Sequence, residues 1–351
     1  MNPRCGLRCP VLVSDRIDWD RDYSSLTLGQ LLAMQPNELA AVDPLAMNLI
    51  VAKGIPALAH IEIRCYQDIV NGWVTDFAHR CLPRWESYFY ENPQEFDNDI
   101  RYFRLGMVCQ YLELEVGIQY NRDQRESQRV LYTNPSDLFL NGVLDTREGT
   151  CGNMAALQLA FGWRLGWPVS LACVNSHFIL RFDDGRTIYN IEATQSGYGG
   201  FKSDPDEYLI ATKKLPAIAI TSGSDLRALR PHEVLGSFIG LRARHLQDVG
   251  KHEHDVTKFV ESEPDWLLAR HLFPTNRALY ASQMAVSMIR GDRLFAAGEP
   301  GHPENAAGRL NESRRASVGS GRTPDRRHEA SPQGTRLQTV DPLVFHVEVT
   351  R

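Results

Sequence analysis

The sequence lacks the features of membrane, secreted and nucleic-acid-binding proteins. No stretch of its 351 residues approaches the roughly 20 apolar residues needed to cross a bilayer. The first twenty residues contain no apolar core of the kind found in a secretory signal. The net charge is −5, so the chain has no basic excess to attract nucleic acid or an anionic membrane. We therefore expect a cytoplasmic protein without nucleic-acid or membrane partners.

Cysteine is scarce, odd in number and scattered, which argues against a disulfide framework. No group of histidine, cysteine and acidic residues has the spacing of a metal site. No glycine-rich loop stands between a strand and a helix, so a nucleotide site is not indicated. We therefore expect neither a metal nor a cofactor. The seven cysteines are Cys5, Cys9, Cys65, Cys81, Cys109, Cys151 and Cys173.

The composition changes along the chain and suggests five segments. Apolar residues recur at the helical period in the N-terminal third and again after residue 230. From Ala296 to Pro342 there is no Phe, Tyr, Trp, Ile or Met, so that stretch cannot form a core. The segments are a disordered start (1–22), a helical region (23–134), a core (135–215), helical hairpins, possible tetratricopeptide-like repeats (225–290), and a disordered tail (291–351).

The middle segment has a different pattern, with one helix followed by three strands. The alanine- and leucine-rich residues 151–165 predict a helix that Gly166 and Pro168 end. Three β-rich runs follow at 169–174, 177–182 and 187–193, and short turns between them favour antiparallel pairing. With helices on both sides, the predicted fold class is α+β.

Cys151 stands at the start of this predicted helix. The helix dipole and unpaired backbone N–H groups at that end stabilise a thiolate, which favours a nucleophile. Arg147 adds positive charge or simply fixes the preceding turn, and Gly149 permits a close backbone approach. A small core residue is the alternative interpretation of Cys151.

His177 and Glu192 come together if Asp184-Gly185 is a two-residue hairpin turn. Asp183 then faces Arg186, and stepping back along both strands places His177 directly opposite Glu192. Asn190 lies diagonally on the same face. The carboxylate could orient the imidazole as in a Cys-His-acid triad, whereas a cross-strand salt bridge is the structural alternative. The pairing depends on the register.

The segment Arg147-Glu148-Gly149-Thr150-Cys151 resembles the nucleophile motif of the transglutaminase-like superfamily, which has a papain-like Cys-His-acid core. The order of helix and strands, the histidine, and the stretch Asn190-Ile191-Glu192-Ala193-Thr194 are also similar to that family. Some bacterial relatives combine this domain with helical repeats. The family's acid is usually Asp, so Glu192 departs from its pattern, and Asn190 is an alternative third member.

The resemblance implies thiol acyl chemistry on an amide or peptide bond of a protein or peptide. Cys151 would be the nucleophile, His177 the proton carrier and Glu192 the residue that orients the imidazole. Gln119 is a candidate donor to the oxyanion. Hydrolysis, deamidation and crosslinking all remain open. The alternative is an inactive fold that binds a protein partner through the helical hairpins.

Overall fold

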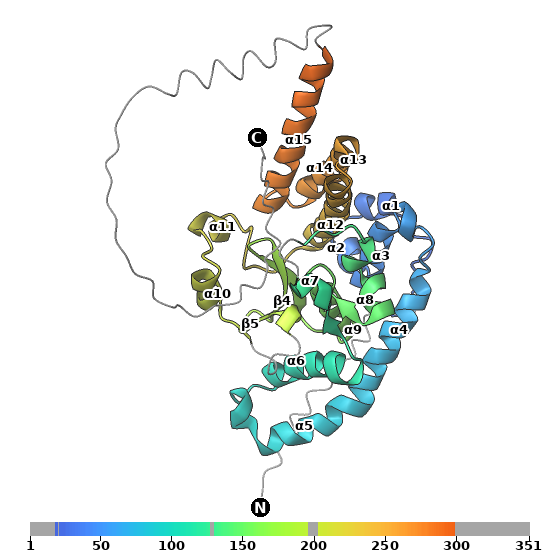
Figure 1. Ribbon diagram of the computed structural model, residues 1–351. Coiled ribbons are helices and arrows are strands. Elements are labelled where there is room, and N and C mark those ends of the chain that lie inside the picture. Colours follow the sequence, from blue (N-terminus) through green and yellow to red (C-terminus); the bar gives the residue numbers. More distant parts are fainter. Residues whose placement is uncertain (1–17, 20, 127–129, 196–202, 299–351) are drawn as a thin grey trace, which may run out of the picture. The chain divides into compact units, whose positions relative to one another are not determined.

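The structure, a computed structural model, describes residues 18–19, 21–126, 130–195 and 203–298 (Figure 1). The chain divides into two units, the first of residues 1–286 and 341–351 and the second of residues 287–340. Of the second unit, residues 287–298 are described, as the continuation of helix α15 (Arg277–Gly298). The helix thus runs past residue 291, where the disordered tail was predicted to begin. The remainder of that tail, and nearly all of the predicted disordered start, lie outside the described residues.

The N-terminal region is helical, as its apolar periodicity predicts. Helix α4, for example, begins at Ile63 and lies within the helical region predicted at 23–134. Two π-helical turns, Phe77–Cys81 and Tyr111–Glu115, extend α4 and α6. The helices are α1 (Leu28–Ala33), α2 (Pro36–Ala40), α3 (Pro44–Ala52), α4 (Ile63–Asp76), α5 (Leu82–Glu91) and α6 (Ile100–Gln110), with 3₁₀ turns at Pro56–Leu58 and Pro93–Phe96.

Helix α9 (Met154–Arg164) lies between these helices and a small sheet. It packs against α3 and α4 on one side and against strands β3 (Val169–Val174) and β4 (His177–Asp183) on the other. Ten of its eleven residues are buried. A helix that is apolar all round suits such a central position, because no face has to meet water.

The sheet has the three antiparallel strands that the sequence predicts, in the order β3, β4 and β5 (Ile188–Ile191). A two-residue turn joins β3 to β4, and both Asn175 and Ser176 have positive φ, at 51° and 69°. That conformation matches the twist of a tight hairpin. The turn therefore delivers the next residue, His177, at the very start of β4.

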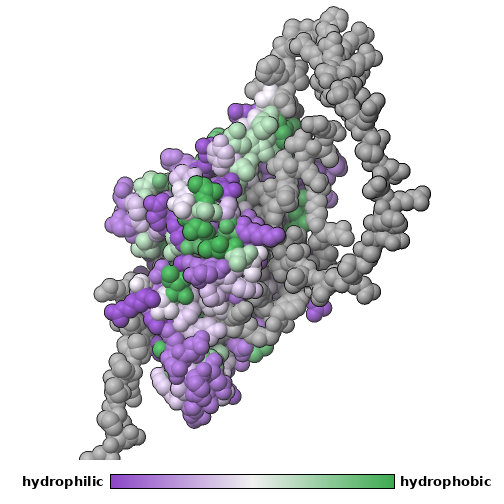
Figure 2. Space-filling model, turned by 90° about the vertical axis from the view of Figure 1, so that its left-hand side faces the viewer, coloured by the Kyte–Doolittle hydropathy of each residue, from purple (hydrophilic) through white to green (hydrophobic). Residues whose placement is uncertain are grey.

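Two short helices, α10 (Asp206–Thr212) and α11 (Ala217–Thr221), cover the face of the sheet opposite α9 (Figure 1). Leu209 and Leu215 pack there against the strand residues Ala172 and Ile179. The side that carries α10 and α11 is turned to the viewer in Figure 2, where apolar side chains gather near the middle. Both faces of the sheet are covered, so β4 is buried along nearly its whole length.

Helix α12 (Pro231–His252) is the long element of the C-terminal region. It packs against α13 (Val256–Glu261) and α14 (Glu263–Leu272), and also against α2 and α3. The remaining elements are α7 (Arg122–Glu126), α8 (Leu140–Thr146), 3₁₀ turns at Pro135–Asp137 and Ala193–Gln195, and a parallel pair of short strands, β1 (Gln119–Tyr120) and β2 (Glu148–Gly149). None of the helices in the described part of the chain is long and apolar enough to cross a membrane.

A buried ion pair joins α9 to the N-terminal helices. Arg164 donates to both carboxylate oxygens of Asp43, at 2.9 and 2.5 Å, and both side chains are at most 2% exposed. Asp43 also caps α3 by accepting the N–H of Leu45. The pair therefore fixes the position of α9, whose N-terminal end leads to Cys151.

Candidate active site

Cys151 lies in the turn between β2 and α9 and is 4% exposed. The helix was predicted to begin at Cys151, but it begins at Met154. Cys151 therefore comes just before the helix and not within it. The reason is the local capping: the Thr150 N–H donates to Asn153 Oδ1 at 2.8 Å, and the Gly152 N–H donates to Thr150 Oγ1 at 3.1 Å. These bonds hold the turn closed and keep Cys151 at the N-terminal end of α9.

Gly149 and Arg147 shape the approach to this turn. A Cβ on Gly149 would come within 2.5 Å of Met154 Cγ, so the close approach expected from the sequence is present. Arg147 has a left-handed backbone with φ 65°, and its guanidinium lies 4.5 Å from the centre of the Trp73 ring. It also donates to the carbonyl of Leu144. Of the two roles considered for Arg147, these contacts fit fixing of the turn.

His177 donates from Nε2 to the carboxylate of Glu192, at 2.8 Å to Oε1 and 2.7 Å to Oε2. The predicted register was nonetheless wrong by two residues, since Leu180 pairs with Ile191. The loop has four residues because the Asp184 carboxylate accepts the N–H groups of Arg186 and Thr187. A shift by two keeps every side chain on its face, so His177 and Glu192 still meet, diagonally and just beyond the end of β5.

The two groups form an ion pair. Burial alone would lower the pKa of His177, but the Glu192 carboxylate and the neighbouring Cys151 outweigh it and raise that pKa to about 10. Burial likewise would raise the pKa of Glu192, yet His177 and the hydrogen bonds from Thr194 lower it to about 2. The imidazole is therefore protonated and the carboxylate ionised across the neutral range.

Thr194 completes the support of the carboxylate. Its backbone N–H and its hydroxyl both donate to Glu192 Oε1, at 3.1 and 2.7 Å. With Nε2 of His177 engaged by Glu192, the other ring nitrogen, Nδ1, is buried and makes no hydrogen bond to any residue that the structure describes. Glu192 therefore holds the ring through one nitrogen and leaves the other without a hydrogen bond in the described part of the chain.

Asn190 and Gln119 make their contacts elsewhere. The Asn190 side chain bonds to Arg181, to the carbonyl of Asp204 and to the carboxylate of Asp206. Asn190 pairs with Arg181 across the strands. The register shift puts this partner two residues away from the one that the predicted hairpin would give. Gln119, in β1 beside β2, donates to Glu148 Oε1 at 3.4 Å. Glu192, and not Asn190, holds His177.

Tyr132 was missed by the sequence analysis. Its hydroxyl lies 3.3 Å from Cys151 Sγ, and the tyrosine is 3% exposed. Burial and the neighbouring Cys151 raise the pKa of Tyr132 well above its ordinary value. No motif or periodicity marks this residue, because it lies in irregular chain before η5 (Pro135–Asp137) and reaches Cys151 only through the tertiary fold.

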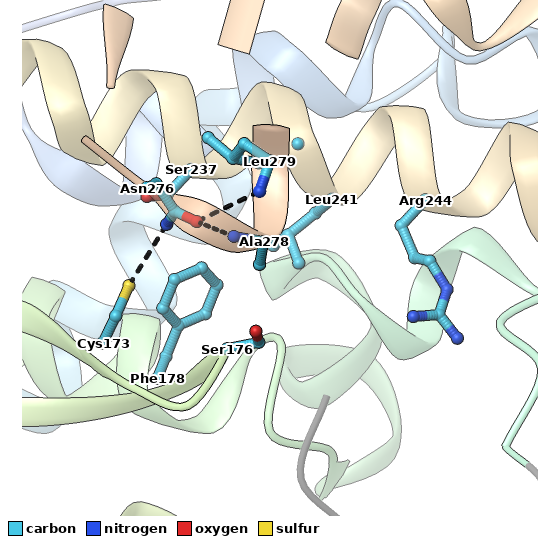
Figure 3. Close-up of a pocket in the computed structure, with 10 residues that line it drawn as sticks. Cys173, Ser176, Phe178, Ser237, Leu241, Arg244, Asn276, Ala278 and Leu279 are labelled. Atoms are coloured by element: carbon cyan, nitrogen blue, oxygen red, sulfur yellow. Dashed lines mark hydrogen bonds between the residues drawn. The ribbon is translucent and has the colours of Figure 1, made fainter. Parts of the chain in front are cut away.

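A small cavity lies between the β3–β4 hairpin, helix α12 and the start of α15 (Figure 3). Its lining includes Ser176, which precedes His177, and Arg244, whose guanidinium lies 5.6 Å from the centre of the Tyr132 ring. Its volume of about 30 Å³ suits one or two water molecules and not a substrate side chain. Among the described residues, no group of three His, Cys, Asp or Glu side chains is placed to hold a metal ion.

Comparison with known proteins agrees with this geometry. Residues 100–236 match the family model of the transglutaminase-like superfamily. The match confirms the predicted transglutaminase-like domain within these residues and agrees with the α+β fold class, and it extends on both sides of the core expected at 135–215. It contains Tyr132, Cys151, His177 and Glu192, and it ends within the first turns of α12. No curated protein and no solved structure matches the chain.

Proposed function

Because residues 100–236 form a domain of the transglutaminase-like superfamily, we propose that this chain is a thiol enzyme that acts on amide or peptide bonds. Cys151 is the nucleophile, His177 carries the proton and Glu192 orients the imidazole. The observation that carries the proposal is the bond from His177 Nε2 to both oxygens of Glu192, which leaves Nδ1 without a hydrogen bond to any described residue, while the nearby Cys151 is among the groups that raise the pKa of His177. A buried ion pair that served only stability would not need a thiol beside it.

The reaction follows from the protonation states. In the proposed reactive form the proton of the Cys151 thiol resides on the imidazole of His177, whose pKa Glu192 and Cys151 raise to about 10. The thiolate attacks the carbonyl carbon, forming the S–C bond while the π electron pair moves to oxygen. When the C–N bond breaks, the leaving amine takes the proton from His177. A thioester remains on Cys151.

The second half of the reaction transfers the acyl group to an acceptor. His177, now neutral, takes a proton from the acceptor, whose oxygen or nitrogen attacks the thioester and releases Cys151. Water as acceptor gives hydrolysis, or deamidation when the substrate is a side-chain amide. A primary amine gives a new amide bond, and therefore crosslinking when both groups are on proteins. Protein or peptide carboxamides are the substrate class in each case.

The test is the pH dependence of Cys151 alkylation by iodoacetamide, followed by peptide mass mapping so that each cysteine is read separately. Cys65, which is exposed, is the internal reference for a solvent-accessible thiol. In wild type we expect Cys151 to react well below pH 8.5, where ordinary thiols are mostly protonated. His177→Ala should abolish this reactivity. The control is His232→Ala, a half-buried histidine of α12 whose charged neighbours are Arg230, Glu233 and Arg227.

An inactive fold is the second candidate, and the low exposure of Cys151 favours it. In that case the helices α12, α13 and α14 would serve as the binding module for a protein partner, and the domain at 100–236 would be their support. The same experiment separates the two candidates. An inactive fold predicts that Cys151 reacts slowly at every pH and that His177→Ala does not change its rate.

A further inference from the structure

The nucleophile has a second polar neighbour besides His177, the hydroxyl of Tyr132. Its oxygen lies 3.3 Å from Cys151 Sγ, and both residues are less than 5% exposed. A hydroxyl at this distance is a hydrogen-bond partner of the sulfur, and the thiolate form of Cys151 can only accept. Because burial and Cys151 raise the pKa of Tyr132, the phenol keeps its proton and remains a donor.

Helix α12 holds Tyr132 in place from the other side. The Tyr132 N–H donates to Asp248 Oδ2 at 3.2 Å, and the Tyr132 carbonyl accepts from His245 Nδ1 at 3.0 Å. Arg244 packs over the ring and is itself held by Asp248, whose Oδ2 lies 2.5 Å from its Nε. Asp248 is fully buried. Three contacts from α12 thus fix one irregular residue, which is how a catalytic donor is usually positioned.

The position of the hydroxyl relative to the sulfur indicates its task. Once Sγ has bonded to the carbonyl carbon, the oxyanion is attached to that same carbon and lies beside Sγ. A donor in contact with Sγ is therefore within hydrogen-bond reach of the oxyanion after a small rotation. Such donors act most strongly where water is excluded, as it is around a residue that is 3% exposed.

We propose that the Tyr132 hydroxyl is a donor of the oxyanion hole, together with the backbone N–H of Cys151. The inference rests on the proposed thiol acyl chemistry and adds a catalytic residue to it. The tyrosine gives up no proton: it donates a hydrogen bond while the electron pair resides on oxygen, and the bond weakens when the carbonyl re-forms. Gln119, the donor expected from the sequence, bonds instead to Glu148 at the exposed edge of β1.

The experiment compares two reactions of Cys151 in the full-length protein. Acylation by p-nitrophenyl acetate passes through an oxyanion, whereas alkylation by iodoacetamide is a displacement at a saturated carbon and forms none. The variant is Tyr132→Phe, which removes only the hydroxyl. The matched control is Tyr111→Phe, a tyrosine that is 2% exposed and whose hydroxyl donates to Asp76 at 2.9 Å. The ratio of the two rates on one preparation cancels any loss of folded protein.

We expect Tyr132→Phe to slow acylation by about a hundredfold while the alkylation rate and its pH profile stay unchanged. Tyr111→Phe should change neither reaction. An equal fall in both rates would overturn the inference, because the hydroxyl would then act on the thiolate. Unchanged acylation would overturn it as well. If wild-type Cys151 is inert to both reagents, the proposed function itself fails and the inference fails with it, a result visible before any tyrosine variant is made.

Discussion

Replacement of Glu192 by glutamine tests the centre of the proposed mechanism. Glutamine keeps the length of the side chain and removes its charge. Glu192 Oε1 accepts from His177 and twice from Thr194, so the amide oxygen of glutamine can keep one set of these bonds. The perturbation is therefore mainly electrostatic, and it acts on Nε2, the ring nitrogen that Glu192 holds.

The magnitude follows from the forces on His177. Glu192 is the largest of the influences that raise the pKa of His177 from 6.5 to about 10, and burial is the opposing one. Without the carboxylate, burial opposes only the raising effect of Cys151, and we expect that pKa to fall back to about 6.5 or lower. At pH 7.5 the imidazolium then falls from nearly the whole population to about a tenth or less. The thiolate–imidazolium pair becomes correspondingly rare, and we expect Cys151 alkylation at this pH to slow by about tenfold or more.

The assay is the pH profile of Cys151 alkylation, combined with direct titration of the His177 ring by NMR. Glu192→Asp is the control, because it restores the charge with a shorter side chain and matches the acid that is usual in the family. It should keep the raised pKa of His177 at least in part and lie between wild type and the glutamine variant. Comparison of the two variants separates the effect of charge from the effect of reach.

The reasoning would be refuted by a Glu192→Gln protein in which His177 titrates as in wild type. It would also be refuted if the pKa of His177 fell as expected and the alkylation profile of Cys151 did not move. The second result would mean that the imidazole and the thiol do not exchange a proton, and it would favour the inactive fold.

Three further predictions concern stability. The pKa of His177 in the folded protein, about 10, lies above the ordinary 6.5, so the contribution of His177 to the free energy of unfolding is fully present below pH 6.5 and is lost as the pH rises towards 10. Urea unfolding of wild type should show this decline, and His177→Gln should lack it. Asp43→Asn breaks the buried pair with Arg164 and should lower the free energy of unfolding by about 3–5 kcal/mol. Asp68→Asn, in an exposed pair, should lower it by less than about 1 kcal/mol. Equal losses would contradict the role of burial. Gly149→Ala places a methyl 2.5 Å from Met154 Cγ and should lower the free energy of unfolding by about 1–3 kcal/mol. Gly72→Ala, in open space on α4, should be neutral or stabilising. Thermal melting of the two variants tests this difference.

Much of this site could be predicted from the sequence because its parts are local. The three strands follow from short β-rich runs between turn residues, and β3 has the predicted ends, Val169 and Val174. The close approach at Gly149 follows from a motif of five consecutive residues. The meeting of His177 with Glu192 was predicted for a partly wrong reason, since the register differs by two, but the alternation of side chains makes an even shift harmless.

The sequence by itself predicted a transglutaminase-like domain, the helix–strand order and the three residues of the proposed triad, since each depends on neighbours a few positions away. Only the tertiary structure decided which groups surround them. Tyr132 reaches Cys151 because α12 holds it from more than a hundred residues away. Arg147 packs on Trp73 for the same reason. Contacts between distant segments are selected by the packing of the whole chain, and no local pattern of residues encodes them.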